Sequence, residues 1–153
     1  MCIRDRIGFN YRMTEISGAF GKVQLKKFPN ILRDSKKRYQ ALEDCIDHKD
    51  IKFRSVNSGS EPNYDTFVIS IENKKLRNKV ISLLNKAGFG TKNLPDAFNW
   101  HCAYFWEHID KKIRNKEVKN CYDRLLKCVA IPILVSRPIK DYKDIASDIN
   151  ECS

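Results

Sequence analysis

The chain has 153 residues, of which 42% are hydrophobic, and a formal net charge of +10. This length suffices to bury one hydrophobic core, so the composition favours one soluble domain or a piece of a larger one. The longest apolar run, Val129 to Val135, is far shorter than the roughly 20 residues that cross a bilayer, so we expect no membrane contact.

The first six residues read MCIRDR, which resembles the translated end of a transposase adapter used in sequencing libraries, with the last codon completed by the insert. We therefore expect residues 1–6 to be non-native and the natural protein to continue upstream of Ile7. The N-terminus shows no secretion signal, which favours a cytoplasmic location.

A helix is expected to begin at Thr14, which can cap it, because apolar residues recur at helical spacing through Ile16, Phe20 and Val23. Pro29 is expected to interrupt this helix, and a second helix, bent against the first at the proline, should follow through Ile46. If an upstream domain is missing, the apolar side of the first helix should be exposed.

Two strands should come next, because residues 51–56 and 64–71 alternate, the second with Phe67, Ile69 and Ile71 on one face. A helix is predicted over residues 74–88, with Gly88 in the C-cap position, and a short strand over 89–94.

The remaining residues predict a short strand with Ile131 and Ile133 and a terminal helix over 139–152 with Ile145 and Ile149 facing inward. The order of elements indicates an α+β fold, a small sheet covered by helices.

The basic charge has two interpretations. A small nucleic-acid-binding module would use clustered Lys and Arg to neutralise phosphates. Here the basic residues alternate with acidic and apolar ones, as in ENKKLRNK and DKKIRNK, which is typical of solvated helix faces. We therefore expect no nucleic-acid partner, and the module remains the alternative.

The six cysteines show no CxxC and no Cys/His spacing of a zinc finger. We expect no metal site and reduced, mostly buried thiols.

The segment GFNYRMTEISGAFG places Asn10, Tyr11 and Arg12 directly before the first helix. On residue types alone, Asn10 is a turn residue and Arg12 a surface charge. The other interpretation is chemical: an Asn amide can donate to a phosphate, and an Arg guanidinium offers a planar fork of donors to a carboxylate or phosphate.

This segment resembles the G-x-N-x-R-[MI]-[ST]-E motif of the pyridoxal-phosphate (PLP) sugar aminotransferases, the DegT/DnrJ/EryC1/StrS family. The likeness continues in the order of elements across residues 7–150. It implies the aspartate aminotransferase-like (fold type I) fold, with residues 7–28 ending the large cofactor domain and starting the linking helix, and 29–153 forming the C-terminal small domain.

The resemblance also implies PLP as cofactor, a keto-sugar or sugar-aldehyde substrate, and an amino donor, usually L-glutamate. It implies a homodimer with a shared active site, in which Asn10 meets the cofactor phosphate of the neighbouring subunit, while Arg12 and Tyr11 lie near the substrate.

The family's Schiff-base lysine precedes this motif, before a Gly-rich stretch, and no Lys-Gly-Gly arrangement occurs in this sequence. We expect no catalytic residue in this chain, which should be inactive alone.

A second stretch, NLPDAFNWHCAYFWEHI, is rich in aromatic residues. Phe98, Ala103 and Trp106 fit a helical core face, whereas His101 and His108 lie two helical turns apart, on one face of such a helix.

The corresponding region of the family lines the sugar pocket, which implies sugar contacts from Trp100, His101 and His108. The N-W-H and W-x-H-I spacing is also similar to a branch that aminates an oxidised 3-deoxy-octulosonate of lipopolysaccharide. Other members use nucleotide-linked sugars in cell-surface polysaccharide biosynthesis.

Overall fold

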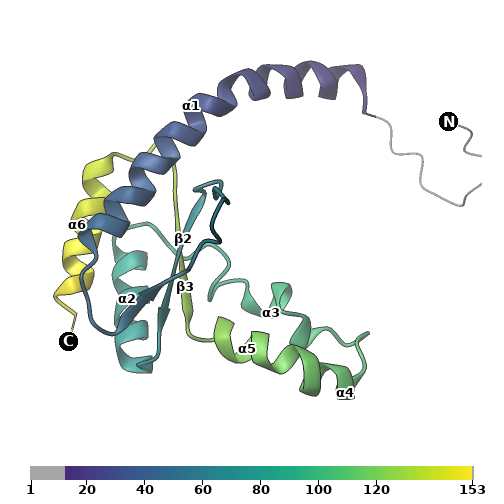
Figure 1. Ribbon diagram of the computed structural model, residues 1–153, viewed down its shortest axis with the longest axis vertical. Helices are drawn as coiled ribbons and strands as arrows, with labels where there is room; N and C mark the ends of the chain where they lie inside the picture. The colour runs from purple at the N-terminus through teal and green to yellow at the C-terminus, as the bar shows by residue number, and fades with distance from the viewer. Residues whose placement is uncertain (1–12, 153) are drawn as a thin grey trace, which may run out of the picture. The chain divides into compact units, whose positions relative to one another are not determined.

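A computed structural model describes residues 13–152 of the chain (Figure 1). The chain divides into two compact units between Ile31 and Leu32. The elements in chain order are α1 (Glu15–Cys45), β1 (Ile51–Phe53), β2 (Thr66–Ile71), α2 (Lys74–Lys86), α3 (Phe98–His101), the 3-10 helix η1 (Ala103–Phe105), α4 (Lys111–Ile113), the π-helix η2 (Arg114–Val118), α5 (Lys119–Leu125), β3 (Cys128–Pro132) and α6 (Ile139–Asn150).

Helix α1 begins where the sequence predicts. The Ser17 N–H donates to Thr14 Oγ1 at 3.2 Å, which confirms Thr14 as the N-cap. The predicted break at Pro29 is wrong, because this proline lies inside one continuous helix. Proline removes the single hydrogen bond to the carbonyl four residues earlier, and Leu25 is exposed, so water can satisfy that carbonyl.

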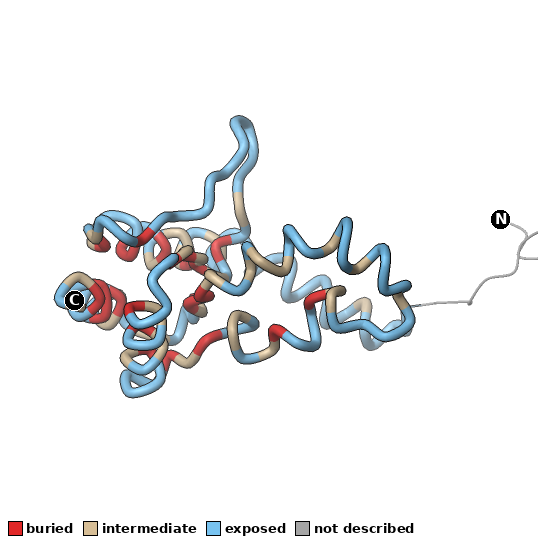
Figure 2. The backbone as a smooth tube through the Cα atoms, turned by 90° about the horizontal axis from the view of Figure 1, so that it is seen from below, coloured by how far each residue is buried: buried red, intermediate tan, exposed pale blue. Residues whose placement is uncertain are grey.

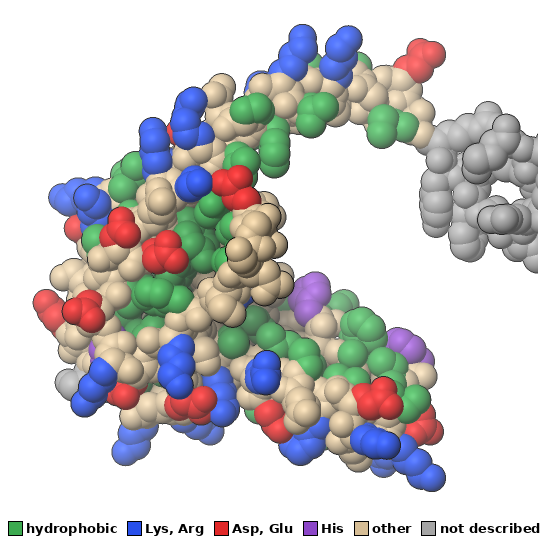
Figure 3. Space-filling view, viewed as in Figure 1, with side chains coloured by type: hydrophobic (Ala, Val, Ile, Leu, Met, Phe, Trp, Pro, Cys, Tyr) green, Lys and Arg blue, Asp and Glu red, His purple; other side chains and the backbone are tan. Residues whose placement is uncertain are grey.

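In the first unit, α1 is amphipathic and its apolar side is uncovered. Ile16, Phe20 and Val23 are 72%, 68% and 50% exposed, which confirms the expectation for this side of the helix. Figure 3 shows the hydrophobic side chains along one side of this half of α1 and Lys and Arg along another.

The second unit contains an antiparallel sheet in the order β1-β2-β3. Its register places Ile69 opposite Val129 and Phe67 opposite Ile131. Alternation in β2 buries Phe67, Ile69 and Ile71, as predicted. The strand expected over 51–56 is shorter and ends at Phe53.

Three helices add their apolar sides to this sheet, which confirms the predicted α+β class. Buried residues of α2, α6 and the second half of α1 belong to the same core cluster as the strands. They include Leu42, Val80, Leu84, Tyr142 and Ile149, all fully buried. In Figure 2 the buried residues lie in this second unit.

Helix α2 has a complete cap at each end. The side chain of Asn73 accepts from the N–H groups of Lys75 and Leu76. At the other end Gly88 has φ +71°, and the Phe89 N–H donates to Leu84 O at 2.8 Å. This is the left-handed termination that glycine favours, so the prediction for Gly88 is confirmed.

The strand predicted over residues 89–94 is not formed. Gly90 has φ +64°, which interrupts an extended run, and Pro95 has no N–H to donate. Two backbone hydrogen bonds still join this segment to β3, from the Lys92 N–H to Ala130 O and from the Ala130 N–H to Leu94 O.

The loop between β3 and α6 is held from two sides. The hydroxyl of Tyr142 accepts from the Leu134 N–H at 2.8 Å. The guanidinium of Arg38, on α1, donates to Val135 O and Arg137 O at 2.7 and 2.8 Å. The predicted inward positions of Ile145 and Ile149 on α6 are confirmed.

Asn150 connects the end of α6 to the end of α1. Its Oδ1 accepts from the Asp47 N–H at 2.9 Å, and its Nδ2 donates to Cys45 O at 2.8 Å. One side chain thus satisfies the Cys45 carbonyl, which the last turn of α1 leaves unpaired, and the Asp47 N–H just beyond the helix.

Within residues 13–152, no helix is long and apolar enough to cross a membrane, and no group of His, Cys, Asp or Glu could hold a metal ion. The described cysteines are free thiols. The expectation that they are mostly buried is wrong, because Cys102 is buried whereas Cys121 is exposed and the other described thiols are intermediate.

Candidate functional site

An aromatic cluster anchors the segment that carries the predicted sugar-binding residues. Tyr122 of α5 stacks on Tyr104 with ring centroids 4.3 Å apart and on Phe98 at 5.6 Å. Phe105 meets Phe98 edge-on at 5.5 Å. Offset and edge-on aromatic pairs add about 0.5–1.5 kcal/mol each beyond their buried area, so the cluster fixes α3 and η1 on α5.

Trp100, Trp106 and His108 form an exposed aromatic surface beside this cluster. Trp100 is 83% exposed, and its carbonyl accepts from Trp106 Nε1 at 3.0 Å. The rings of Trp106 and His108 stack at 5.6 Å with an interplanar angle of 22°. The hydrogen bond and the stack orient Trp106 and His108 relative to one another and leave Trp100 open to solvent.

His101 and His108 do not share a helix face, contrary to the expectation. Helix α3 ends at His101, and Cys102 is extended with φ −91° and ψ 117°. A 3-10 turn and an irregular turn follow before His108, so the helical spacing does not apply. Both histidines are exposed.

The core interpretation of this stretch holds for Phe98 and fails for Trp106. Phe98 is 7% exposed, whereas Trp106 is 40% exposed. The buried side chain that the sequence interpretation did not choose is Cys102, which is 2% exposed. Its spacing of four from Phe98 is the helical signal that could have identified it.

The sequence interpretation also missed Tyr122 as a member of this region. It lies in the charged stretch KNCYDRL, far along the chain from Trp100. A lone aromatic in a polar helix is a signal for packing, but nothing in its spacing indicates its partner.

Asn10, Tyr11 and Arg12 lie outside the described residues. Their predicted contacts with a cofactor phosphate and with anionic substrate groups therefore stay predictions. The described residues begin with Met13, directly before the Thr14 cap of α1.

The exposed aromatic surface can bind a sugar ring in chemical terms. The faces of indole and imidazole rings are apolar and can pack against the C–H face of a pyranose, while ring nitrogens donate or accept hydrogen bonds to hydroxyls.

Residues 2–150 match the DegT/DnrJ/EryC1/StrS aminotransferase family, whose members use PLP. No match was found among curated proteins.

Similar solved structures include the aminotransferase TlmJ of Streptoalloteichus hindustanus, with a TM-score of 0.68, 12% identity and coverage of 95% of this chain and 38% of TlmJ. A protein of Streptococcus pneumoniae assigned as a sugar aminotransferase, Spr1654, was solved in a PMP form, with a TM-score of 0.64, 19% identity and coverage of 90% and 36%. Its PLP form has a TM-score of 0.58, 18% identity and coverage of 90% and 37%.

At these identities the structural likeness establishes the fold alone, which is that of part of a fold type I aminotransferase. The chain spans less than two fifths of the length of these neighbours. The extent of the family match is nevertheless nearly the whole sequence. The chain belongs to the DegT/DnrJ/EryC1/StrS aminotransferase family.

Proposed function

We propose that the full-length protein is a PLP-dependent aminotransferase that transfers an amino group from L-glutamate to a keto or aldehyde carbon of a sugar. The observation that carries the proposal is the family match over residues 2–150. In this proposal residues 7–28 end the large cofactor domain and residues 29–153 are the C-terminal small domain.

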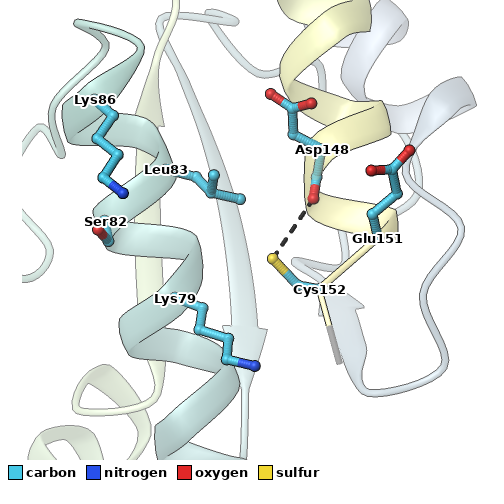
Figure 4. Close-up of a pocket in the computed structure, with 7 residues that line it drawn as sticks. All are labelled: Lys79, Ser82, Leu83, Lys86, Asp148, Glu151 and Cys152. Carbon is cyan, nitrogen blue, oxygen red and sulfur yellow. Dashed lines mark hydrogen bonds between the residues drawn. The ribbon is translucent and has the colours of Figure 1, made fainter.

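The hollow beside α2 and α6 does not fit the cofactor. The hollow in Figure 4, of about 410 Å³, has Lys79 and Lys86 on α2, but Asp148 on α6 and Glu151 directly after α6 also line it. The two lysines are matched by two carboxylates, so the lining has no excess positive charge for a phosphate and this hollow is a poor site for PLP. In this proposal the Schiff-base lysine lies upstream of the motif with Asn10 and Arg12, because no Lys-Gly-Gly arrangement occurs in this sequence.

Bound PLP supplies the electron sink that makes the α-proton of the amino donor removable. The contribution of this chain to holding it is Asn10, whose amide is suited to donate to a phosphate oxygen of the neighbouring subunit's cofactor. Arg12 and Tyr11 would hold the anionic groups of the sugar or the donor.

The sugar would lie against the exposed aromatic surface, with Trp100, His101 and His108 as its contacts. Support comes from the exposure of Trp100 and from the Trp106–His108 stack, which holds one imidazole at a defined angle. The substrate in this proposal is a nucleotide-linked keto-sugar or an oxidised 3-deoxy-octulosonate, within cytoplasmic steps of cell-surface polysaccharide or lipopolysaccharide synthesis.

A homodimer with a shared active site is part of the proposal. The apolar side of α1 with Ile16, Phe20 and Val23 is exposed. Soluble proteins rarely leave large apolar patches exposed, which supports the view that another protein surface covers this side.

The cofactor test compares the full-length protein with the 153-residue chain. We expect the full-length protein to bind PLP and to show the absorbance of a lysine-bound cofactor, and the 153-residue chain to show none. A cofactor adduct on a lysine of the 153-residue chain would contradict the assignment of that lysine to upstream sequence.

The sugar test uses Trp100→Ala in the full-length enzyme. This side chain is 83% exposed, so its loss should leave the fold intact. We expect the KM for the sugar to rise about 5-fold or more, from loss of roughly 1–2 kcal/mol of stacking contact, and the KM for glutamate to stay unchanged. If Trp100→Ala and the unaltered enzyme had the same kinetics for both substrates, the aromatic surface would not be part of the sugar site.

A further inference from the structure

A second hollow lies at the other end of α2, beside the end of β2 and the turn before β3. Lys74 and Arg77 line it from the first turns of α2, and Leu126 and Lys127 from the turn before β3. Ile71 at the end of β2, Glu72 directly after it and Asp123 on α5 complete the lining. Its volume is about 470 Å³. Pockets for small molecules typically measure about 300–1,000 Å³, so this hollow can hold more than a single ion.

Arg77 is the unusual group in this hollow. No described residue forms a hydrogen bond or an ion pair with its guanidinium, and its Nε is buried without a partner. Burial lowers the pKa of Arg77, and the neighbouring Cys128 thiol opposes this shift. A half-buried cation without an acceptor is costly, and an anion in the hollow would supply acceptors to the accessible part of the fork.

The two carboxylates of the lining, Glu72 and Asp123, are already paired with lysines. Glu72 forms an ion pair with Lys127 at 2.6 Å, and Asp123 with Lys119 at 3.1 Å. Lys74 has no carboxylate partner within the described part of the chain. The positive charge that remains at the hollow therefore belongs to Arg77 and Lys74.

The apolar part of the lining sets the rest of the ligand. Leu126 is 38% exposed beside Ile71, so a hydrocarbon or ring attached to the anion would cover apolar surface there. A free inorganic ion would leave that surface in contact with water.

We propose that this hollow binds a small phosphorylated ligand, with its phosphate on Arg77 and Lys74 and its organic part over Leu126. A phosphate dianion fits two uncompensated cations, and the planar guanidinium fork matches two phosphate oxygens. All its lining residues belong to the unit from Leu32 onward, so the site can be tested in the 153-residue chain.

The experiment is calorimetric titration of the 153-residue chain with phenyl phosphate, inorganic phosphate and benzoate at physiological salt. Phenyl phosphate should bind more tightly than either of the others, because it alone carries both the phosphate and the apolar ring. Benzoate binding as tightly as phenyl phosphate would overturn the phosphate assignment.

Two variants, each of which removes one arginine charge, distinguish binding in the hollow from nonspecific attraction of an anion to a basic chain. Arg77→Gln should weaken phenyl phosphate binding at least 10-fold, the worth of one charge-assisted hydrogen bond. Arg33→Gln removes an exposed arginine of α1 beside Asp34 and should bind like the unaltered chain. Equal affinity in both variants would overturn the proposal.

If circular dichroism shows that Arg77→Gln is unfolded, Lys74→Gln replaces it. Lys74 is exposed, so this variant should fold and should still lose about 3-fold or more in affinity. Unchanged affinity in the folded Lys74→Gln chain would equally overturn the proposal.

Discussion

Replacing Tyr142 by phenylalanine isolates one buried hydrogen-bonding group. The ring of Tyr142 is fully buried, and its hydroxyl accepts from the Leu134 N–H at 2.8 Å. The hydroxyl also lies 3.4 Å from the carbonyl oxygens of Pro132 and Leu134. Phenylalanine keeps the ring in the core and leaves the Leu134 N–H without this acceptor.

The expected cost follows from that unpaired donor. This hydrogen bond is only partly buried, because Leu134 is 47% exposed, so we expect Tyr142→Phe to lower the free energy of unfolding by about 0.5–1.5 kcal/mol, the net worth of one hydrogen bond. Tyr39→Phe is a matched control, because Tyr39 is 5% exposed in the same core and its hydroxyl forms no hydrogen bond among the described residues. That control should change the free energy of unfolding by less than about 0.5 kcal/mol.

Urea unfolding of the 153-residue chain, followed by circular dichroism, measures both variants. The slope of free energy against urea should stay the same, so that the change appears in the midpoint alone. If Tyr142→Phe destabilised the chain no more than Tyr39→Phe does, the Leu134 N–H would not depend on this hydroxyl and the reasoning would be refuted.

Two further predictions concern the proposed active site and the pH dependence of stability. In the full-length enzyme, Arg12→Lys should raise a Michaelis constant and so lower kcat/KM by an amount worth about 1.5–3 kcal/mol. Asn10→Ala should lose cofactor and recover much of its rate with excess PLP. If steady-state kinetics showed no change in Arg12→Lys, this arginine would be only a surface charge. Burial raises the pKa of the Asp65 carboxyl, but the hydrogen bond and charge of Lys92 outweigh it and hold that pKa below its usual value. This exposed pair should contribute at most about 1 kcal/mol of stability above the unfolded carboxyl pKa of about 4, and that contribution should be lost as pH falls through the folded pKa. The free energies of unfolding of Asp65→Asn and the unaltered chain, measured in urea, should therefore differ at pH 6 and become similar below about pH 3.

Segments with a regular spacing of hydrophobic residues and clear end signals were predictable from the sequence. The alternation of β2, the helical spacing of α2 with Gly88 after it, and the inward Ile145 and Ile149 all follow from local rules. Pro29 was misjudged because proline leaves one carbonyl without its helical partner, and on an exposed helix water can satisfy that carbonyl, so the helix continues. The segment before Pro95 was misjudged because a left-handed glycine has no signature beyond the residue itself.

The candidate site was less predictable than the fold. The family resemblance selected Trp100, His101 and His108, but the helical periodicity used to relate the two histidines ended at Cys102. Tyr122 joins the region through the tertiary contact between α5 and α3, and no local pattern encodes such a contact. Whether the guanidinium of Arg77 has a partner depends on which acidic residues are already paired with other cations. The sequence alone does not show this.

The link that Asn150 makes between the ends of α6 and α1 has a consequence for synthesis of the protein. Its two hydrogen bonds join residues 103 and 105 positions apart in the chain. On a ribosome, α1 emerges long before the residue that completes its last turn, and the sheet lacks β3 during most of that interval. We therefore expect this unit to stay incompletely folded until its final helix has left the exit tunnel, and a stalled chain lacking residues 148–153 to be a substrate for chaperones and proteases.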